Sequence, residues 1–202
     1  MRRTSLFRSA TVATATLLTL LTFSTGSEAE SRVSTAAVSG VSGMRSQNTL
    51  SCTLTTGPGE RISFSPAVSS TPRSVSARGS AQLNNCTSPN GRQSRIRSGQ
   101  LTLSGTGRAS CARASGIRGS GTITWYSGPY RSGRIIGRST LRPASNGSRG
   151  YTPLDSFLSG TIVSGLMQGH PFSGVAVPTN DVRRCYGSGV GYVQGRGRLS
   201  VA

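Results

Sequence analysis

The chain has 202 residues, a formal net charge of +18, four cysteines and one histidine. All of its basic charge comes from arginine, and the lack of lysine excludes Walker-type nucleotide sites and Ser-x-x-Lys hydrolases. Because aromatic residues make up only 5% of the sequence and hydrophobic residues 34%, the core must consist mainly of aliphatic side chains.

The N-terminus has the pattern of a secretory signal peptide. Three arginines within the first eight residues precede an uncharged, largely apolar run over 10–23, and Ser27-Glu28-Ala29 offers the small residues that a signal peptidase reads. We expect cleavage after Ala29, which lowers the net charge from +18 to +16. The apolar run is shorter than the roughly 20 residues of a membrane-spanning helix. We therefore expect a secreted, extracellular chain with no membrane span. The alternatives are an uncleaved anchor and, from Arg2-Arg3, twin-arginine export.

Residues 30–49 are rich in Ser, Thr, Ala and Gly and are expected to form a flexible leader. Residues 50–202 contain short alternating runs that end at Gly, Pro or Asn, which predicts a single β-rich domain. The expected fold is all-β, an antiparallel β-sandwich or open barrel. Pairs of residues two apart should face its core: Ile62 and Phe64, Leu101 and Leu103, Ile123 and Trp125, Val175 and Val177, and Leu199 and Val201.

Two segments depart from simple strand alternation. Residues 62–88 contain Pro66 and Pro72, which predict a turn between two strands, the second of which ends at a cysteine. The best helical spacing lies in residues 151–160, where Leu154, Phe157 and Leu158 could form one or two turns.

All four cysteines lie beyond the predicted cleavage site, and an even number in a secreted chain predicts two disulfides. Of the three pairings that four cysteines allow, we favour the order-preserving one, Cys52–Cys86 with Cys111–Cys185. No two cysteines are close enough in sequence to form a zinc knuckle, and we expect neither a metal nor a cofactor.

A series of motifs runs from Cys52 to the end of the chain. It consists of FSPAVSSTPRSV ahead of NNCTS, then Cys111, GTITWYSG, SGTIVSGLMQGHPFSG and a late Cys185. In these motifs the chain resembles a group of small exported proteins of actinobacteria that have no assigned function. The resemblance implies secretion, a β-rich fold and two disulfides, and it implies no activity.

The evidence for catalysis is weak. A triad would require His170 beside Asp155 or Asp181 and an activated serine, but the sequence has no Gly-x-Ser-x-Gly elbow. We expect His170 to occupy a turn at the sheet edge, and Glu60 and Asp181 to form surface ion pairs with arginines. We predict that the chain is not an enzyme. The alternative is a secreted hydrolase that uses His170 with these scattered acids or with Glu30.

The segment WYSGPY, residues 125–130, holds the main aromatic cluster. We expect Trp125 in the core beside Ile123, which leaves Tyr126 and Tyr130 as a candidate ligand surface.

The arginines are spread along the whole chain, so a dedicated nucleic-acid site is not expected. The predicted function is an extracellular structural or binding module at the cell envelope, with anionic envelope polymers or carbohydrate as candidate partners. Polyanion binding, the remaining alternative, predicts arginines gathered on one face.

Overall fold

The computed structural model describes residues 49–144 and 156–202, with the side chains of 156–158 left out. These residues belong to one compact unit. The predicted signal peptide and almost all of the predicted leader lie outside the described residues. Within the described part of the chain, no helix has the length and apolar character needed to cross a membrane.

The described residues form ten strands and two short 3-10 helices, which confirms the all-β expectation. The strands are β1 (Leu50–Thr55), β2 (Ile62–Val68), β3 (Arg73–Thr87), β4 (Ser98–Ala109), β5 (Ala114–Tyr126), β6 (Ile135–Pro143), β7 (Ser156–Gly165), β8 (Pro171–Pro178), β9 (Val190–Val193) and β10 (Gly195–Val201). The 3-10 helices are η1 (Pro129–Arg131) and η2 (Arg183–Tyr186).

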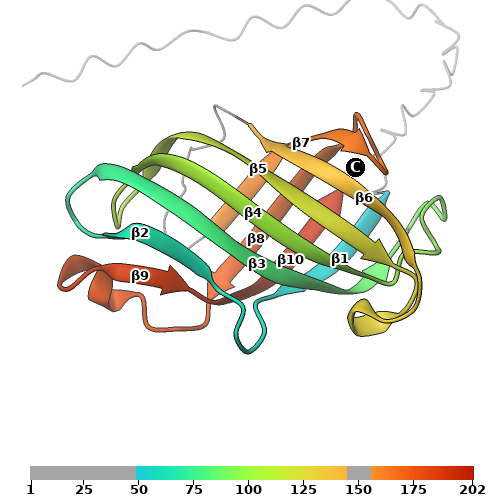
Figure 1. The fold of residues 1–202 in the computed structure, drawn as a ribbon, viewed down its shortest axis with the longest axis horizontal. Helices are drawn as coiled ribbons and strands as arrows, with labels where there is room; N and C mark the ends of the chain where they lie inside the picture. The colour runs from blue at the N-terminus through green and yellow to red at the C-terminus, as the bar shows by residue number, and fades with distance from the viewer. Residues whose placement is uncertain (1–48, 145–155) are drawn as a thin grey trace, which may run out of the picture. The chain divides into compact units, whose positions relative to one another are not determined.

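All strand pairs are antiparallel, and eight strands close into a barrel in the order β1-β10-β8-β7-β6-β5-β4-β3, with β3 pairing back to β1. The expected sandwich or open barrel is therefore replaced by a closed one. The 15-residue strand β3 makes closure possible, because its first half pairs with β2 and its second half with β1. Figure 1 shows β3, β4 and β5 running diagonally across the near wall, with β8, β10 and β1 crossing behind them.

Glycines allow neighbouring strands of the barrel to approach closely. Gly105 of β4 lies directly opposite Gly119 of β5. A Cβ atom on Gly105 would lie 2.8 Å from the main-chain oxygen of Arg118, and one on Gly119 would collide with that of Ser104. Any side chain here would push the strands apart, so glycine permits the tight coiling of the wall.

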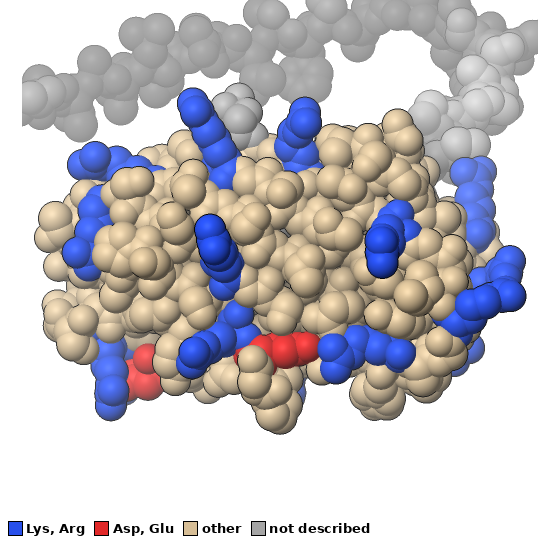
Figure 2. Space-filling view, in the orientation of Figure 1, with Lys and Arg blue, Asp and Glu red and all other residues tan. Residues whose placement is uncertain are grey.

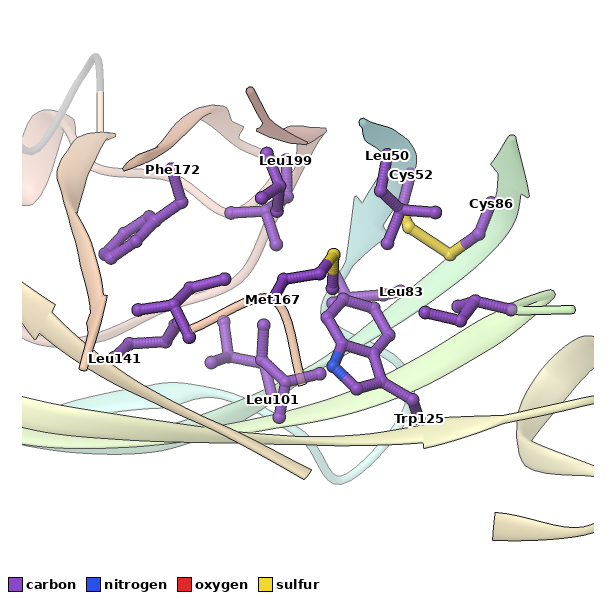
Figure 3. Close-up of a cluster of buried hydrophobic side chains, with 14 of the residues drawn as sticks. Leu50, Cys52, Leu83, Cys86, Leu101, Trp125, Leu141, Met167, Phe172 and Leu199 are labelled. Atoms are coloured by element: carbon purple, nitrogen blue, oxygen red, sulfur yellow. A yellow bond between two sulfur atoms is a disulfide. The ribbon is translucent and has the colours of Figure 1, made fainter. Parts of the chain in front are cut away.

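The largest hydrophobic cluster surrounds Trp125, which is fully buried as predicted. Its Nε1 donates a hydrogen bond of 2.8 Å to Ser139 Oγ, so the one polar atom of the indole is satisfied inside the core. Figure 3 shows the indole facing Leu83 and Met167, with the Cys52–Cys86 disulfide nearby.

Both disulfides of the favoured pairing are present, and no described cysteine is free. The Cα atoms are 4.1 Å apart in Cys52–Cys86 and 5.7 Å apart in Cys111–Cys185. The first disulfide belongs to the cluster around Trp125. The second belongs to a separate cluster that includes Val68, Val190 and Val193.

One of the five predicted inward pairs is wrong. Val175 and Val177 point outward and are 51% and 57% exposed, whereas Phe172 and Gly174 are buried. Both alternating faces of FSGVAVP carry apolar residues, so a one-residue error in choosing the face reversed the assignment. The helical prediction for 151–160 is also wrong where it can be checked, because β7 begins at Ser156; the residues before it lie outside the described residues.

Candidate functional site

The interior of the barrel differs between its two halves. The filled half is the part around Trp125, where Leu50, Leu83, Ile96 and Ile123 are completely or almost completely buried. The hollow half is the part toward the β4–β5 turn. It contains an apolar cavity of about 210 Å³, which is the candidate functional site.

The cavity follows from a change in side-chain size along the strands. On β4 the inward residues pass from Leu101 and Leu103 to Gly105 and Gly107, all of which line the cavity. On β5 they pass from Trp125 and Ile123 to glycine at 121 and 119. Inward and outward positions still alternate along both strands, but the inward positions are now glycines. The wall therefore remains intact while the space inside it is left unfilled.

The opposite wall repeats this pattern. On β8 the buried Phe172 is followed on the same face by Gly174, Ala176 and Pro178, which line the cavity. The cavity floor consists of larger side chains that also belong to the filled half, including Leu101, Leu141, Phe172 and Leu199.

A cap adjoins the hollow half, formed by the end of β2, η2 and β9. The Cys111–Cys185 disulfide joins the β4–β5 turn to η2. Cys111 N donates to the Ser69 main-chain oxygen at 2.9 Å, and Cys185 Sγ lies 3.6 Å from that of Val68. Val68 and Val193 are buried and line the cavity, so this cap forms part of its wall.

Few polar side chains reach the cavity. Thr56 Oγ1 accepts a hydrogen bond of 2.7 Å from Gly195 N and donates one of 3.3 Å to Gly195 O, which satisfies it. Gln194 Nε2 donates to the Glu60 main-chain oxygen at 3.3 Å. Among the described lining residues the one with an ionisable side chain is Arg118, an exposed residue. The arrangement is therefore suited to binding an apolar molecule.

The acids and the histidine proposed for catalysis lie elsewhere. His170 precedes β8 and its Nδ1 faces the main-chain oxygen of Ala202, while Asp181 follows the same strand. The eight residues of β8 span about 26 Å, and His170 and Asp181 lie beyond its opposite ends. The structure therefore does not bring these two residues together. Asp155 and Glu30 lie outside the described residues.

Glu60 and Asp181 each contact an arginine, as expected. Glu60 Oε1 lies 3.2 Å from Arg131 Nη1 and also accepts a hydrogen bond from Gln100 Nε2. Asp181 Oδ2 lies 3.9 Å from Arg184 Nε. The described residues contain no group of three or more potential metal-ligating side chains.

Neither of the two tyrosines belongs to the main hydrophobic cluster or lines the cavity. Tyr130 is 70% exposed and lies in η1 with a φ of 50°, while Tyr126 is half-buried. The buried Ser98 holds η1 in place, because its Oγ donates to Gly128 O at 2.6 Å and accepts from Arg131 N at 2.9 Å. This arrangement fixes the position of Tyr130 at the surface.

The arginines are dispersed on the face shown in Figure 2, with uncharged surface between them. Strand pairing accounts for this, since Arg78 lies opposite Ser104, Arg118 opposite Thr106 and Arg138 opposite Thr124. Such dispersion on this face argues against a concentrated polyanion site there.

Compared with protein families, curated proteins and solved structures, the chain matches none of them. The cavity is the feature that sequence reasoning missed. Its signal is present in GQLTLSGTG, where the inward positions change from leucine to glycine within one strand.

Proposed function

We propose that this chain is an extracellular binding protein that holds a small apolar molecule in the hollow half of its barrel. The apolar cavity of about 210 Å³ is the observation that carries this proposal. An engineered apolar cavity of about 150 Å³ stays dry and binds benzene, so a larger one has room for a small hydrocarbon-like ligand.

The energetic cost of an empty cavity supports a binding role over a purely structural one. Because the cavity is partly open to solvent, its unfilled apolar lining stays in contact with water, which costs the folded state the free energy that burying this surface would provide. This cost is large for a domain whose core is mainly aliphatic, and a ligand bound in the cavity would offset it by stabilising the folded state.

Export is the second part of the proposal. The signal-like N-terminus, the two disulfides and the resemblance to exported actinobacterial proteins all support an oxidising, extracellular location. The arginine-rich surface would keep the protein near anionic polymers of the cell envelope through salt-sensitive attraction. In this proposal the chain is a carrier or sensor of its ligand and not an enzyme.

Naphthalene, with ten carbon atoms, is a suitable probe of the cavity. We expect the oxidised full chain to bind it with one-to-one stoichiometry and a dissociation constant of roughly 1–100 µM, as its size allows. The measurement is a titration followed by naphthalene fluorescence.

The matched variants lie on one strand. Ala77→Leu places a larger side chain in the cavity and should abolish binding, because Ala77 lines it between Phe64 and Gly105. Ser74→Leu adds a leucine at an exposed position of β3 and should leave the affinity unchanged. Equal binding by both variants, or no binding by the original chain, would overturn the proposal.

A further inference from the structure

We infer that the ligand is uncharged, has an apolar body of about ten non-hydrogen atoms, and donates one hydrogen bond to the side-chain carbonyl of Gln194. This inference rests on the proposed function and specifies its ligand class. It depends on the charges, the volume and the unused hydrogen-bonding capacity at the cavity wall.

The electrostatic environment excludes an ionised ligand. No described Asp, Glu or His residue lines the cavity, and Arg118 belongs to the exposed side of β5. An ammonium group inside would lose hydration without gaining a partner of opposite charge, and a carboxylate could pair only with Arg118, on the exposed side of the wall, so either group loses several kcal/mol of hydration free energy that the cavity lining does not replace. A neutral molecule avoids this penalty.

The volume limits the size of the ligand. A cavity of about 210 Å³ exceeds the roughly 150 Å³ that accommodates benzene and is smaller than the 300–1,000 Å³ of pockets for drug-sized ligands. A compact bicyclic or branched molecule fits these limits, whereas a long acyl chain exceeds them.

Gln194 is one of the polar side chains at the wall that have an unused hydrogen-bond acceptor; the buried Ser110, whose Oγ donates to the Arg113 main-chain oxygen, is another. Its main-chain N donates to Asn180 Oδ1 at 2.8 Å and its main-chain O accepts from Thr179 N at 2.8 Å, so the residue is held on both sides. Its Nε2 donates to the Glu60 carbonyl, and a carbonyl can pair only with the nitrogen of the amide, which fixes the amide orientation.

The remaining atom of that amide, Oε1, makes no hydrogen bond to any described residue. Thr56, the neighbouring polar residue of the wall, is already satisfied by Gly195. Gln194 is half-buried, and its Oε1 is not one of the described side-chain atoms that are fully buried without a partner, so this oxygen is accessible. A hydroxyl or N–H group on the ligand would give it a hydrogen-bond partner.

Three naphthalene derivatives test the inference at pH 7. We expect 2-naphthol to bind about five-fold more tightly than naphthalene, since a net hydrogen bond contributes about 1 kcal/mol. We expect 2-methoxynaphthalene, which cannot donate, to lose this advantage, and 2-naphthoate to bind at least 100-fold more weakly than 2-naphthol. These three comparisons use the unaltered chain and do not depend on a variant folding.

Gln194→Met tests the residue assignment. In this variant naphthalene and 2-naphthol should bind with equal affinity, whatever the absolute affinity is, with the melting temperature as a check of folding. Tight binding of 2-naphthoate, an equally strong preference for the methyl ether, or a naphthol preference that survives Gln194→Met would overturn the inference and leave the proposed function intact. Failure of naphthalene to bind at all would overturn the proposed function itself.

Discussion

The two halves of the barrel share the same strands and the same inward–outward alternation, yet they differ in how the interior is used. In the filled half, Trp125 and Ile123 on β5 pack against Leu101 on β4. A few residues further along the same strands, Gly105 and its partner Gly119 lie side by side in the wall and line the apolar cavity. A closed hydrogen-bonded wall therefore tolerates a hollow interior when another part of the same barrel supplies the packing energy.

The division also separates two roles. Buried side chains in the filled half remove apolar surface from water and stabilise the fold. The small residues in the hollow half contribute little burial, but they create space. Variants placed in each half can therefore test whether stability and binding are separable.

The largest effect is expected at Trp125. Replacing it with alanine removes the largest buried side chain and leaves Ser139 without its indole partner, so Trp125→Ala should lower the free energy of unfolding by about 3–5 kcal/mol. Urea denaturation of the oxidised chain measures this change. Val177→Ala, on the exposed outer face, should change stability by less than about 0.5 kcal/mol, and a similar loss in both variants would contradict the comparison.

The two disulfides lie in different clusters and so distinguish the halves directly. Removing either one by a double Cys→Ala change should cost roughly 2–4 kcal/mol, slightly more for Cys111–Cys185 because its sequence separation is 74 residues and not 34. Only the loss of Cys111–Cys185, which holds the cap, should weaken naphthalene binding, by an expected ten-fold or more. Weakened binding after loss of Cys52–Cys86 alone would show that the halves are not independent.

A pair of glycines on β4 sharpens the contrast in packing. A Cβ on Gly99 would lie 2.9 Å from the ring of Trp125, which is buried and hydrogen-bonded and has no room to move. Gly99→Ala should therefore destabilise the protein by about 1–3 kcal/mol. A Cβ on Gly107, beside the cavity, would lie 3.2 Å from its nearest neighbour, and Gly107→Ala should cost less than about 1 kcal/mol. Equal losses in urea denaturation would show that both sites are packed alike.

The smallest effect has the opposite sign. Ala77→Leu fills part of the cavity with apolar atoms and should stabilise the ligand-free protein by about 0.5–2 kcal/mol. The readout is the shift in the urea midpoint without ligand, together with an unchanged slope. Destabilisation would mean that the leucine does not fit and that the hollow half is smaller than the structure shows.

Local patterns predicted a large part of this fold. Period-two alternation was enough to find the strands and to bury Ile123 and Trp125, because the pleat alone determines which residues share a face. The order-preserving disulfide pairing is confirmed as well. The face of β8 was predicted wrongly, since Val175 and Ala176 both suit an apolar environment and only the partner strands decide between them.

An all-β chain with a buried tryptophan and paired cysteines could be predicted from the sequence, because these properties depend on residue type and on spacing within single strands. Three features could not be predicted in this way: β3 pairs with both β2 and β1, the sheet closes, and Gly105 of β4 lies directly opposite Gly119 of β5. Strand partners far apart in sequence are selected by the packing of the whole barrel. The cavity exists only where several such partners are small at the same level of the barrel.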